Sequence, residues 1–241
     1  MIWNLPVTEF IPFEEIEEAR DVALITSGPA WKAVHEKLHL PITSLFNVTE
    51  ASLDQWDLMP SLLDGDVIYA VGGGLAVDAA KYFASKTDKP LVCLPTALSV
   101  DAFLTWASGI RRGGCVYYLE TKPPDRLLVD FEVIAAAPAP IRSAGICDVL
   151  SIATGLWDWR LAEERGQNPP KMAYIPWVDQ SAQAILQGAL DCSEAAGRGD
   201  REGLNQLLDC LAMEVQLCNQ IGHSRPEEGS EHYFAYAVEN E

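Results

Sequence analysis

Short apolar runs alternate with longer amphipathic stretches through the first half of this chain, and that alternation limits the folds open to it. Four apolar runs fit buried strands, at residues 22–25, 41–46, 66–71 and 90–94, and helical patterns separate them at 30–38, 53–63 and 75–85. Because the strand segments do not alternate regularly between apolar and polar residues, they predict a parallel sheet with helices on both faces. We therefore expect an α/β domain with a parallel, Rossmann-like sheet, an architecture that many unrelated chemistries share.

The pattern changes near residue 140, where Pro138 and Pro140 flank an alanine. Two further strands are predicted before that point, at 115–118 and 127–130, and long helical patterns follow it at 141–165, 178–194 and 202–221. We place a domain boundary there, so that residues 1–140 form the α/β domain and residues 141–241 an all-α C-terminal domain. The last helical segment, 229–241, stops without a cap, and we interpret the helical domain as incomplete.

The balance of charges excludes several kinds of partner. Lysine and arginine together number 17 and aspartate and glutamate 35, which gives a net charge of −18. A chain this acidic repels phosphate backbones and anionic membranes, so we expect no nucleic-acid partner, although a local pocket for a small anion is still compatible with it. Residues 1–13 lack the basic and apolar regions of a signal peptide, and no apolar run is long enough to span a bilayer. We therefore expect a cytoplasmic protein without membrane insertion.

The six cysteines lie in mostly apolar surroundings and show no C-x-x-C spacing. This distribution argues against a zinc ribbon and against a disulfide framework. We interpret the cysteines as free, buried thiols of a reducing compartment.

Three consecutive glycines, Gly72, Gly73 and Gly74, separate a predicted strand from a predicted helix that carries Asp78 and Lys81. Glycines at such a turn let the backbone approach a bound group, and the free N–H groups at the start of the helix then face an anion, so a diphosphate is the natural guest. The motif is neither G-x-G-x-x-G nor a Walker loop. A tight turn that binds nothing is the alternative.

Polar side chains also follow the next predicted strand. Thr96, Ser99 and Thr105 offer hydroxyls and Asp101 a carboxylate, which suit hydrogen bonds to ribose, phosphate or a polyol. They are expected at the carboxyl end of the strands, where open parallel sheets bind ligands. Local turn hydrogen bonds made by the same side chains are an equally good explanation.

Two isolated polar residues stand out in the helical half. Asp148 is the lone carboxylate of the apolar run 144–153, so it either faces a cleft or caps a helix N-terminus. His232 lies in segment 227–241, which holds five glutamates and neither lysine nor arginine. A histidine in such a helix is more often solvated or part of a core than a ligand.

Five segments in a fixed order carry a family resemblance: VGGGLAVDAAKYFA (71–84), LPTALSVDAF (94–103), VDFEVIAAAP (129–138), AGICDVLSIATGLWDWRLAEERG (144–166) and SRPEEGSEHYFAYAVE (224–239). Together they resemble the iron-containing alcohol dehydrogenase superfamily, and within it the glycerol-1-phosphate dehydrogenase branch, which is related to glycerol dehydrogenase and dehydroquinate synthase. Five motifs that cover most of the chain are far more specific than any one of them.

The resemblance implies a role for each matching residue. The three glycines would hold the diphosphate of NAD or NADP, and the cofactor groove would be lined by Asp78, Thr96, Ser99 and Thr105. Asp101 matches a carboxylate near the substrate and nicotinamide. Asp148 matches the first metal ligand and His232 the second, so these two complete, with Asp101, the expected catalytic set. In the family a divalent zinc or iron ion polarises a carbonyl while NAD(P)H delivers hydride.

The same resemblance implies a small polyol or polyol phosphate as substrate, such as glycerol 1-phosphate or glycerol, and a homo-oligomeric assembly. It leaves the choice between NAD and NADP open. Arg225 and Lys122 are candidate partners for a substrate phosphate, and either could equally be a surface charge.

The sequence also departs from the family pattern. The third metal ligand of the family, a histidine in a His-Gly-Glu segment beyond the match to His232, has no counterpart before Glu241, and two protein ligands are one short of a usual catalytic zinc site. His223 is a weak candidate to replace it. Glu227 and Glu228 stand where small residues are common, and two extra acids disfavour a phosphorylated substrate. Leu75 stands where the family often has lysine.

Two other functions therefore stay open beside a metal-dependent NAD(P)-linked oxidoreductase. The first is a nucleotide-binding homologue or fragment that is catalytically incomplete. The second is a lyase like dehydroquinate synthase, which would need more basic residues around its substrate than this acidic chain offers.

Overall fold

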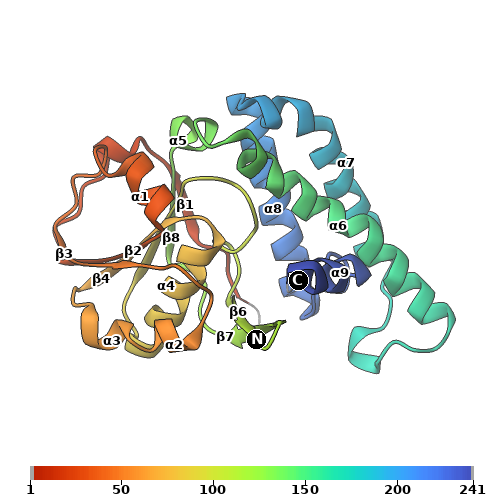
Figure 1. Ribbon diagram of the computed structural model, residues 1–241. Helices are drawn as coiled ribbons and strands as arrows, with labels where there is room; N and C mark the ends of the chain where they lie inside the picture. Colours follow the sequence, from red (N-terminus) through yellow and green to blue (C-terminus); the bar gives the residue numbers. More distant parts are fainter. Residues whose placement is uncertain (1–2, 240–241) are drawn as a thin grey trace.

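Buried apolar strands line up in one parallel sheet, as the sequence predicts. The computed structural model describes residues 3–239. Six parallel strands have the order β1-β8-β5-β4-β2-β3 (Figure 1). They are β1 (Val7–Phe10), β2 (Val22–Thr26), β3 (Ile42–Asn47), β4 (Val67–Gly72), β5 (Leu91–Pro95) and β8 (Arg126–Val129). The prediction of a parallel, Rossmann-like sheet is confirmed.

Alternate residues of the central strands point into two separate cores. In β2, Ala23 and Ile25 join the core on one face of the sheet, whereas Val22 and Leu24 join the core on the other. This division follows from the two-residue period of a strand, and it explains why both sets of side chains are apolar. Helix α4 (Gly74–Thr87) packs into the first core, and α1 (Gly28–Val34), through Val34, into the second.

The predicted helix 53–63 is two short helices, so that prediction is wrong in detail. They are α2 (Leu53–Trp56) and α3 (Met59–Leu62), and the predicted helix at 30–38 ends early, at Val34. Pro60 lies in the first turn of α3. A proline is accommodated at the start of a helix, but inside a continuous one it would remove a hydrogen bond and clash with the preceding turn.

Two strands were not predicted, and one predicted strand lies outside the main sheet. β6 (Ala107–Arg112) and β7 (Cys115–Glu120) form a separate antiparallel hairpin. Its turn is formed by Gly113 and Gly114, both with positive φ, at 58° and 75°. Two residues with φ above zero are what a tight hairpin turn requires. β1 escaped prediction because it is a mostly exposed edge strand without an apolar run.

The second half of the chain is helical, and Figure 1 shows it beside the sheet. Its long helices are α6 (Ala139–Glu164), α7 (Pro176–Arg198) and α8 (Arg201–Ile221), which pack together; the shorter α9 (Ser230–Glu239) contacts α6 and β7. Two short 3-10 turns, η1 (Phe13–Glu15) and η2 (Pro170–Met172), and the short helix α5 (Phe131–Ala135) complete the described elements.

Helix α6 begins at Ala139, beside the predicted domain boundary at residue 140. The last two residues of the helix predicted at 229–241 lie outside the described part of the chain. Within residues 3–239, none of the helices combines the length and the hydropathy needed to cross a membrane.

The cysteines are free, but the prediction that they are buried holds only in part. Cys93, Cys192 and Cys210 are buried, whereas Cys115 and Cys147 are exposed. Cys115 lies on the exposed hairpin, and Cys147 lies on the solvent side of α6, so the apolar neighbours in the sequence did not imply burial at either position.

Candidate active site

A cavity of about 1060 Å³ lies between the carboxyl-end loops of the sheet and the helical half of the chain. Its walls come from α4, from the loop after β5, from the β6–β7 hairpin and from α6, α8 and α9. Among the lining residues are Gly74, Asp78, Asp101, Thr105, Asp148 and His232, which are six of the residues that sequence analysis singled out.

The glycine turn ends β4 and begins α4 directly beside this cavity. Gly72 has a φ of +149°, which L side chains rarely adopt, and a Cβ on Gly74 would lie 3.0 Å from Cγ2 of Val100. Gly73 is the N-cap of α4, and none of the described side chains caps that end of the helix. The glycines are therefore needed for close packing, and they also leave the first amides of α4 available to an anion.

The polar loop after β5 lies against this turn. The Thr96 amide donates to the Gly72 carbonyl at 3.2 Å, and a Cβ on Gly73 would lie 3.4 Å from Oγ of Ser99. Thr96 and Ser99 are beside the turn but are not among the residues that line the cavity. Thr105 does line it, and its Oγ1 accepts a hydrogen bond from Nζ of Lys81 at 3.1 Å.

Asp78 makes internal contacts although it lines the cavity. Its Oδ1 lies 2.9 Å from Nζ of the fully buried Lys81, and its Oδ2 accepts a hydrogen bond from the Gly109 amide at 3.0 Å. Lys81 also donates to the carbonyls of Ala102, at 2.8 Å, and Ala107. This pair ties α4 to the loop after β5 and to β6, and a contact between Asp78 and a cofactor stays a prediction.

Four carboxyl groups come together in the cavity, those of Asp101, Asp148, Glu214 and Glu227. Oδ2 of Asp148 accepts a hydrogen bond from the Asp101 amide at 3.1 Å. Burial raises the pKa of Asp101 to about 6. Two causes raise the pKa of Asp148 to about 8: burial, which is the larger, and the charge of Asp101. Burial and the neighbouring carboxylates also raise the pKa values of Glu214 and Glu227 well above their ordinary range.

Glu214 was missed by the sequence analysis, and Glu227 was noted there only as a departure from the family. One oxygen of Asp101, one of Glu214 and one of Glu227 lie within 4.8 Å of one another. The signal for Glu214 was present in the sequence, because it is an acid between Leu211 and Val215 on the buried face of an amphipathic helix.

His232 and His223 both line the cavity, and their rings contact different neighbours. Nδ1 of His232 lies 2.7 Å from Oε1 of Glu231, an arrangement that orients the ring and leaves Nε2 as its ligand atom. The ring of His223 packs edge-on against Trp159, with centroids 5.5 Å apart, and burial lowers its pKa. Asp148 and His232 thus share a cavity, and a metal ion between them stays a prediction.

The two candidate phosphate partners are not among the residues that line the cavity. Lys122 lies 3.2 Å from a carboxylate oxygen of Asp125, and Nη2 of Arg225 donates to Asn168 at 3.3 Å. Arg111 does line the cavity, from β6, with its guanidinium 5.9 Å from the ring centroid of Tyr236.

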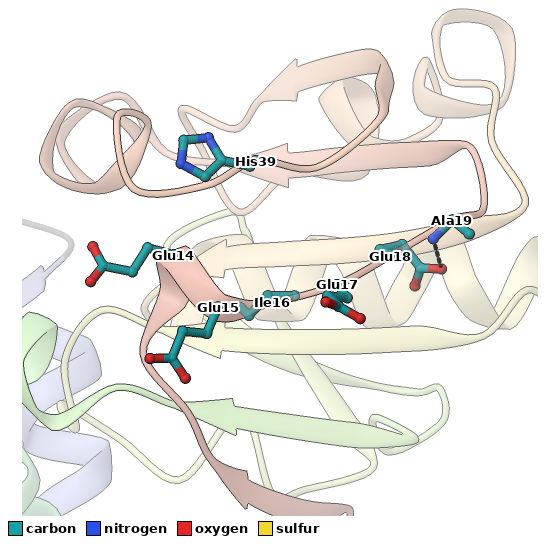
Figure 2. Close-up of a pocket in the computed structure, with 7 residues that line it drawn as sticks. All are labelled: Glu14, Glu15, Ile16, Glu17, Glu18, Ala19 and His39. Carbon is teal, nitrogen blue, oxygen red and sulfur yellow. Dashed lines mark hydrogen bonds between the residues drawn. The ribbon is translucent and has the colours of Figure 1, made fainter.

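A second, shallow cavity of about 650 Å³ lies beside the segments that lead into β2 and β3. Figure 2 shows its acidic side chains, among them Glu14, Glu15 and Glu17, pointing in different directions. Because these carboxylates do not converge on a common point, we assign no site there.

A family model described as iron-containing alcohol dehydrogenase matches residues 13–138, which is more than half of the chain. The chain belongs to the iron-containing alcohol dehydrogenase family. The match covers the glycine turn, the polar loop after β5 and the hairpin, so it includes the sheet side of the cavity.

Similarity to named relatives extends into the helical half. The chain is 28% identical to a glycerol-1-phosphate dehydrogenase [NAD(P)+] of Sulfurisphaera tokodaii, over 99% of this chain and 72% of the relative. It is 33% identical to the enzyme of the same name from Sulfolobus acidocaldarius, over 71% of this chain and 48% of the relative. The matched region therefore spans between about half and three quarters of the length of these two relatives.

Solved structures share the fold at lower identity. Glycerol dehydrogenase from Schizosaccharomyces pombe superimposes with a TM-score of 0.70 at 19% identity, over 99% of this chain and 66% of that one. Sulfoacetaldehyde reductase from Bifidobacterium kashiwanohense, solved in complex with NAD+, superimposes with a TM-score of 0.67 at 16% identity, over 100% of this chain and 72% of that one. At this level of identity the likeness concerns the fold.

Proposed function

We propose that the chain is an NAD(P)-linked oxidoreductase that transfers hydride between the cofactor and a small polyol or polyol phosphate. The observation that carries the proposal is the glycine turn, which opens at the carboxyl end of β4 beside a cavity lined by carboxyl groups. The names of the relatives, glycerol-1-phosphate dehydrogenase [NAD(P)+], support a polyol phosphate as the substrate class.

In this proposal the chain binds the cofactor mainly through its backbone. The amides at the uncapped start of α4 bind the diphosphate, and the glycines keep side chains out of its path. Ser99 and Thr96, which lie beside the turn, donate hydroxyl hydrogen bonds to the same groups. NAD(P)H, when bound, supplies the hydride.

The substrate is held by the acids of the cavity. Asp101 and Asp148 accept hydrogen bonds from hydroxyl groups of a polyol, and both line the same cavity as Gly74 of the cofactor turn. Arg111, from the hairpin, is the lining residue whose charge suits a phosphate group.

The family implies a zinc or iron ion, and the donors in this cavity fit a divalent cation. The resemblance assigns that ion to Asp148 and His232, which line the same cavity, and Glu231 holds the histidine ring in a ligand orientation. Such an ion polarises a carbonyl oxygen as a Lewis acid when bound. A homo-oligomeric state and a cytoplasmic location belong to the same proposal.

NADH and NADPH oxidation by the purified chain tests the proposal, with dihydroxyacetone phosphate and dihydroxyacetone as paired substrates. We expect oxidation of at least one of the two cofactors with at least one of the two substrates. This activity should be lost in Asp148→Asn and His232→Ala. Binding of NADH without turnover would favour the nucleotide-binding homologue instead. A requirement for NAD+ without net change in absorbance would favour the lyase.

The Gly73→Val substitution tests the glycine turn separately by calorimetric titration with NADH. The valine side chain would extend toward Ser99 and occupy the space at the start of α4. We therefore expect the affinity for NADH to fall by at least about tenfold. The exposed Ala136→Val substitution, outside the cavity lining, is the matched control and should leave the affinity unchanged. Equal affinities in all three proteins would rule out the turn as the cofactor site.

A further inference from the structure

Glu214 is a buried carboxyl that the proposed hydride transfer does not use. It lies on α8 between apolar neighbours, and only 4% of the residue is exposed. Its Oε2 has no hydrogen-bond partner within the described residues. A buried carboxyl without a donor loses the hydration that it had in the unfolded chain and recovers nothing in return. In the cavity wall, this oxygen is therefore open to a partner that the described residues do not supply.

Two further carboxyls point to the same place from other segments. Glu227 comes from the connection between α8 and α9, and its Oε2 is also buried without a partner inside the part of the chain that the structure describes. Asp101 comes from the loop after β5. One oxygen from each of the three residues lies within 4.8 Å of the others. Asp101 of the sheet half and two glutamates of the helical half thus come together in a half-buried cavity wall, where carboxylates repel one another.

A divalent cation resolves both the missing partners and the repulsion. Its charge offsets the carboxylates, and its coordination uses the lone pairs that now have no donor. The three donors are all oxygens, which is the chemistry that Mg²⁺ and Mn²⁺ prefer, whereas structural and catalytic zinc sites draw on histidine and cysteine.

We propose that Asp101, Glu214 and Glu227 bind a hard divalent cation of the Mg²⁺ or Mn²⁺ class. This site uses Glu214 and Glu227, which the family resemblance does not assign to a metal, and it contains no histidine. The inference goes beyond the proposed function and does not depend on it, because metal binding is measured without cofactor or substrate. A cation there also offsets the acids that would otherwise repel an anionic substrate.

Calorimetric titration of the metal-stripped full chain with MnCl₂ tests the site. We expect about one Mn²⁺ per chain, with affinity reduced by at least about tenfold in Glu214→Gln and in Glu227→Gln. Glu202→Gln is the matched control, because Glu202 is an exposed glutamate on the same helix as Glu214. It should bind Mn²⁺ like the unmodified protein.

Melting temperatures in EDTA separate loss of the site from loss of the fold. Glu214→Gln replaces a buried carboxyl of a crowded acidic cluster with a neutral amide of similar size, so it should melt no lower than the unmodified chain in EDTA. With MnCl₂ the unmodified chain should gain stability and the variant should not. If Glu214→Gln melts at a lower temperature than the unmodified chain in EDTA, the same two melting temperatures are measured for Glu227→Gln, whose side chain comes from a connecting segment. The inference then requires that MnCl₂ raise the melting temperature of the unmodified chain and not that of Glu227→Gln.

Two results would overturn the inference. The first is an unmodified chain that binds no Mn²⁺. The second is Mn²⁺ binding that Glu214→Gln and Glu227→Gln leave unchanged, as it would be if the ion occupied the site of Asp148 and His232. A chain that binds Mn²⁺ as expected but oxidises no NADH would leave this inference standing and remove the proposed function.

Discussion

Lys81 joins three segments through a single buried ammonium group. Its Nζ lies 2.9 Å from Oδ1 of Asp78 and donates to the Ala102 carbonyl at 2.8 Å and to Oγ1 of Thr105 at 3.1 Å. The side chain is fully buried, so these contacts replace all of its hydration. The pattern of a lysine three residues after an aspartate is common on helix surfaces, and only the fold shows that this one faces inward.

Replacing Lys81 with methionine should lower the free energy of unfolding by about 3 to 5 kcal/mol, because the change leaves the Asp78 carboxylate without its cationic partner and with the Gly109 amide alone. Urea unfolding followed by circular dichroism measures the loss. Lys86→Met is the control, since Lys86 is exposed on the same helix, and it should cost less than about 1 kcal/mol. Similar losses in the two variants would contradict the importance of the buried pair.

Glu18 should stabilise the protein in a pH-dependent way. Hydrogen bonds from Arg20, with a further one from the Tyr69 hydroxyl at 3.0 Å, lower its pKa from 4.5 to about 2. A carboxyl whose pKa is lower in the folded state contributes stability that is present above the unfolded pKa and is lost as the pH falls toward the folded one.

The Glu18→Gln substitution tests this dependence. We expect the unmodified chain to be more stable than the variant above about pH 4.5, and the difference to shrink as the pH falls toward 2. Urea unfolding at several pH values gives the two curves. A difference that stays constant across this range would mean that the ionised carboxylate contributes nothing specific.

At the scale of the site residues, the sequence predicted the types of residue better than their partners. Asp101 and Asp148 were singled out for separate reasons, and the fold joins them through the Asp101 amide. Glu214 was not singled out, because its meaning depends on what α8 packs against, and that is a tertiary property. Lys122 and Arg225 were chosen by charge alone, and the fold directs both to other partners.

Helix α6 can pack against the loop after β5 only because position 145 has no side chain. A Cβ on Gly145 would lie 2.0 Å from the carbonyl oxygen of Leu98. Gly145→Ala should therefore destabilise the protein by about 1 to 3 kcal/mol or more, although alanine favours a helix over glycine by about 1 kcal/mol.

Gly197→Ala provides the comparison for that element. It lies on α7, where a Cβ would make an ordinary contact 3.6 Å from Oγ of Ser143. Denaturant unfolding should show Gly197→Ala at least as stable as the unmodified chain, and Gly145→Ala less stable. Equal free energies of unfolding for the two variants would mean that α6 does not approach the loop as closely as the structure shows.

Among the elements, burial decided what could be predicted. The central strands are buried on both faces, so their apolar runs were visible in the sequence. β1 and β7 are largely exposed; β1 carries no comparable pattern and was missed, whereas the segment 115–118 predicted β7. β6 was also missed, although its centre is buried. The split between α2 and α3 follows from Pro60, a local signal that the helical spacing of 53–63 concealed.

The whole molecule carries a net charge of −18, and that excess should oppose folding by self-repulsion. Raising the ionic strength from about 0.02 M to about 0.3 M shortens the screening length severalfold, so we expect the melting temperature in EDTA to rise. KCl and NaCl should act alike, because screening depends on ionic strength rather than on the cation. A fall in melting temperature would show that specific ion pairs outweigh the net charge.

Two loops of the cavity rest on one face of α6, at two glycines ten residues apart. Gly145 lies against the loop after β5, and Gly155 lies against Arg225 and Pro226, next to Glu227. At 1.5 Å per residue these two points are about 15 Å apart. Because the stretch between them is an uninterrupted helix, it is a rigid spacer. The cavity can open only if both loops move together with α6, or if one loop loses its contact with the glycine against which it packs. The length of helix between the two glycines therefore limits the size of the molecule that fits between the loops.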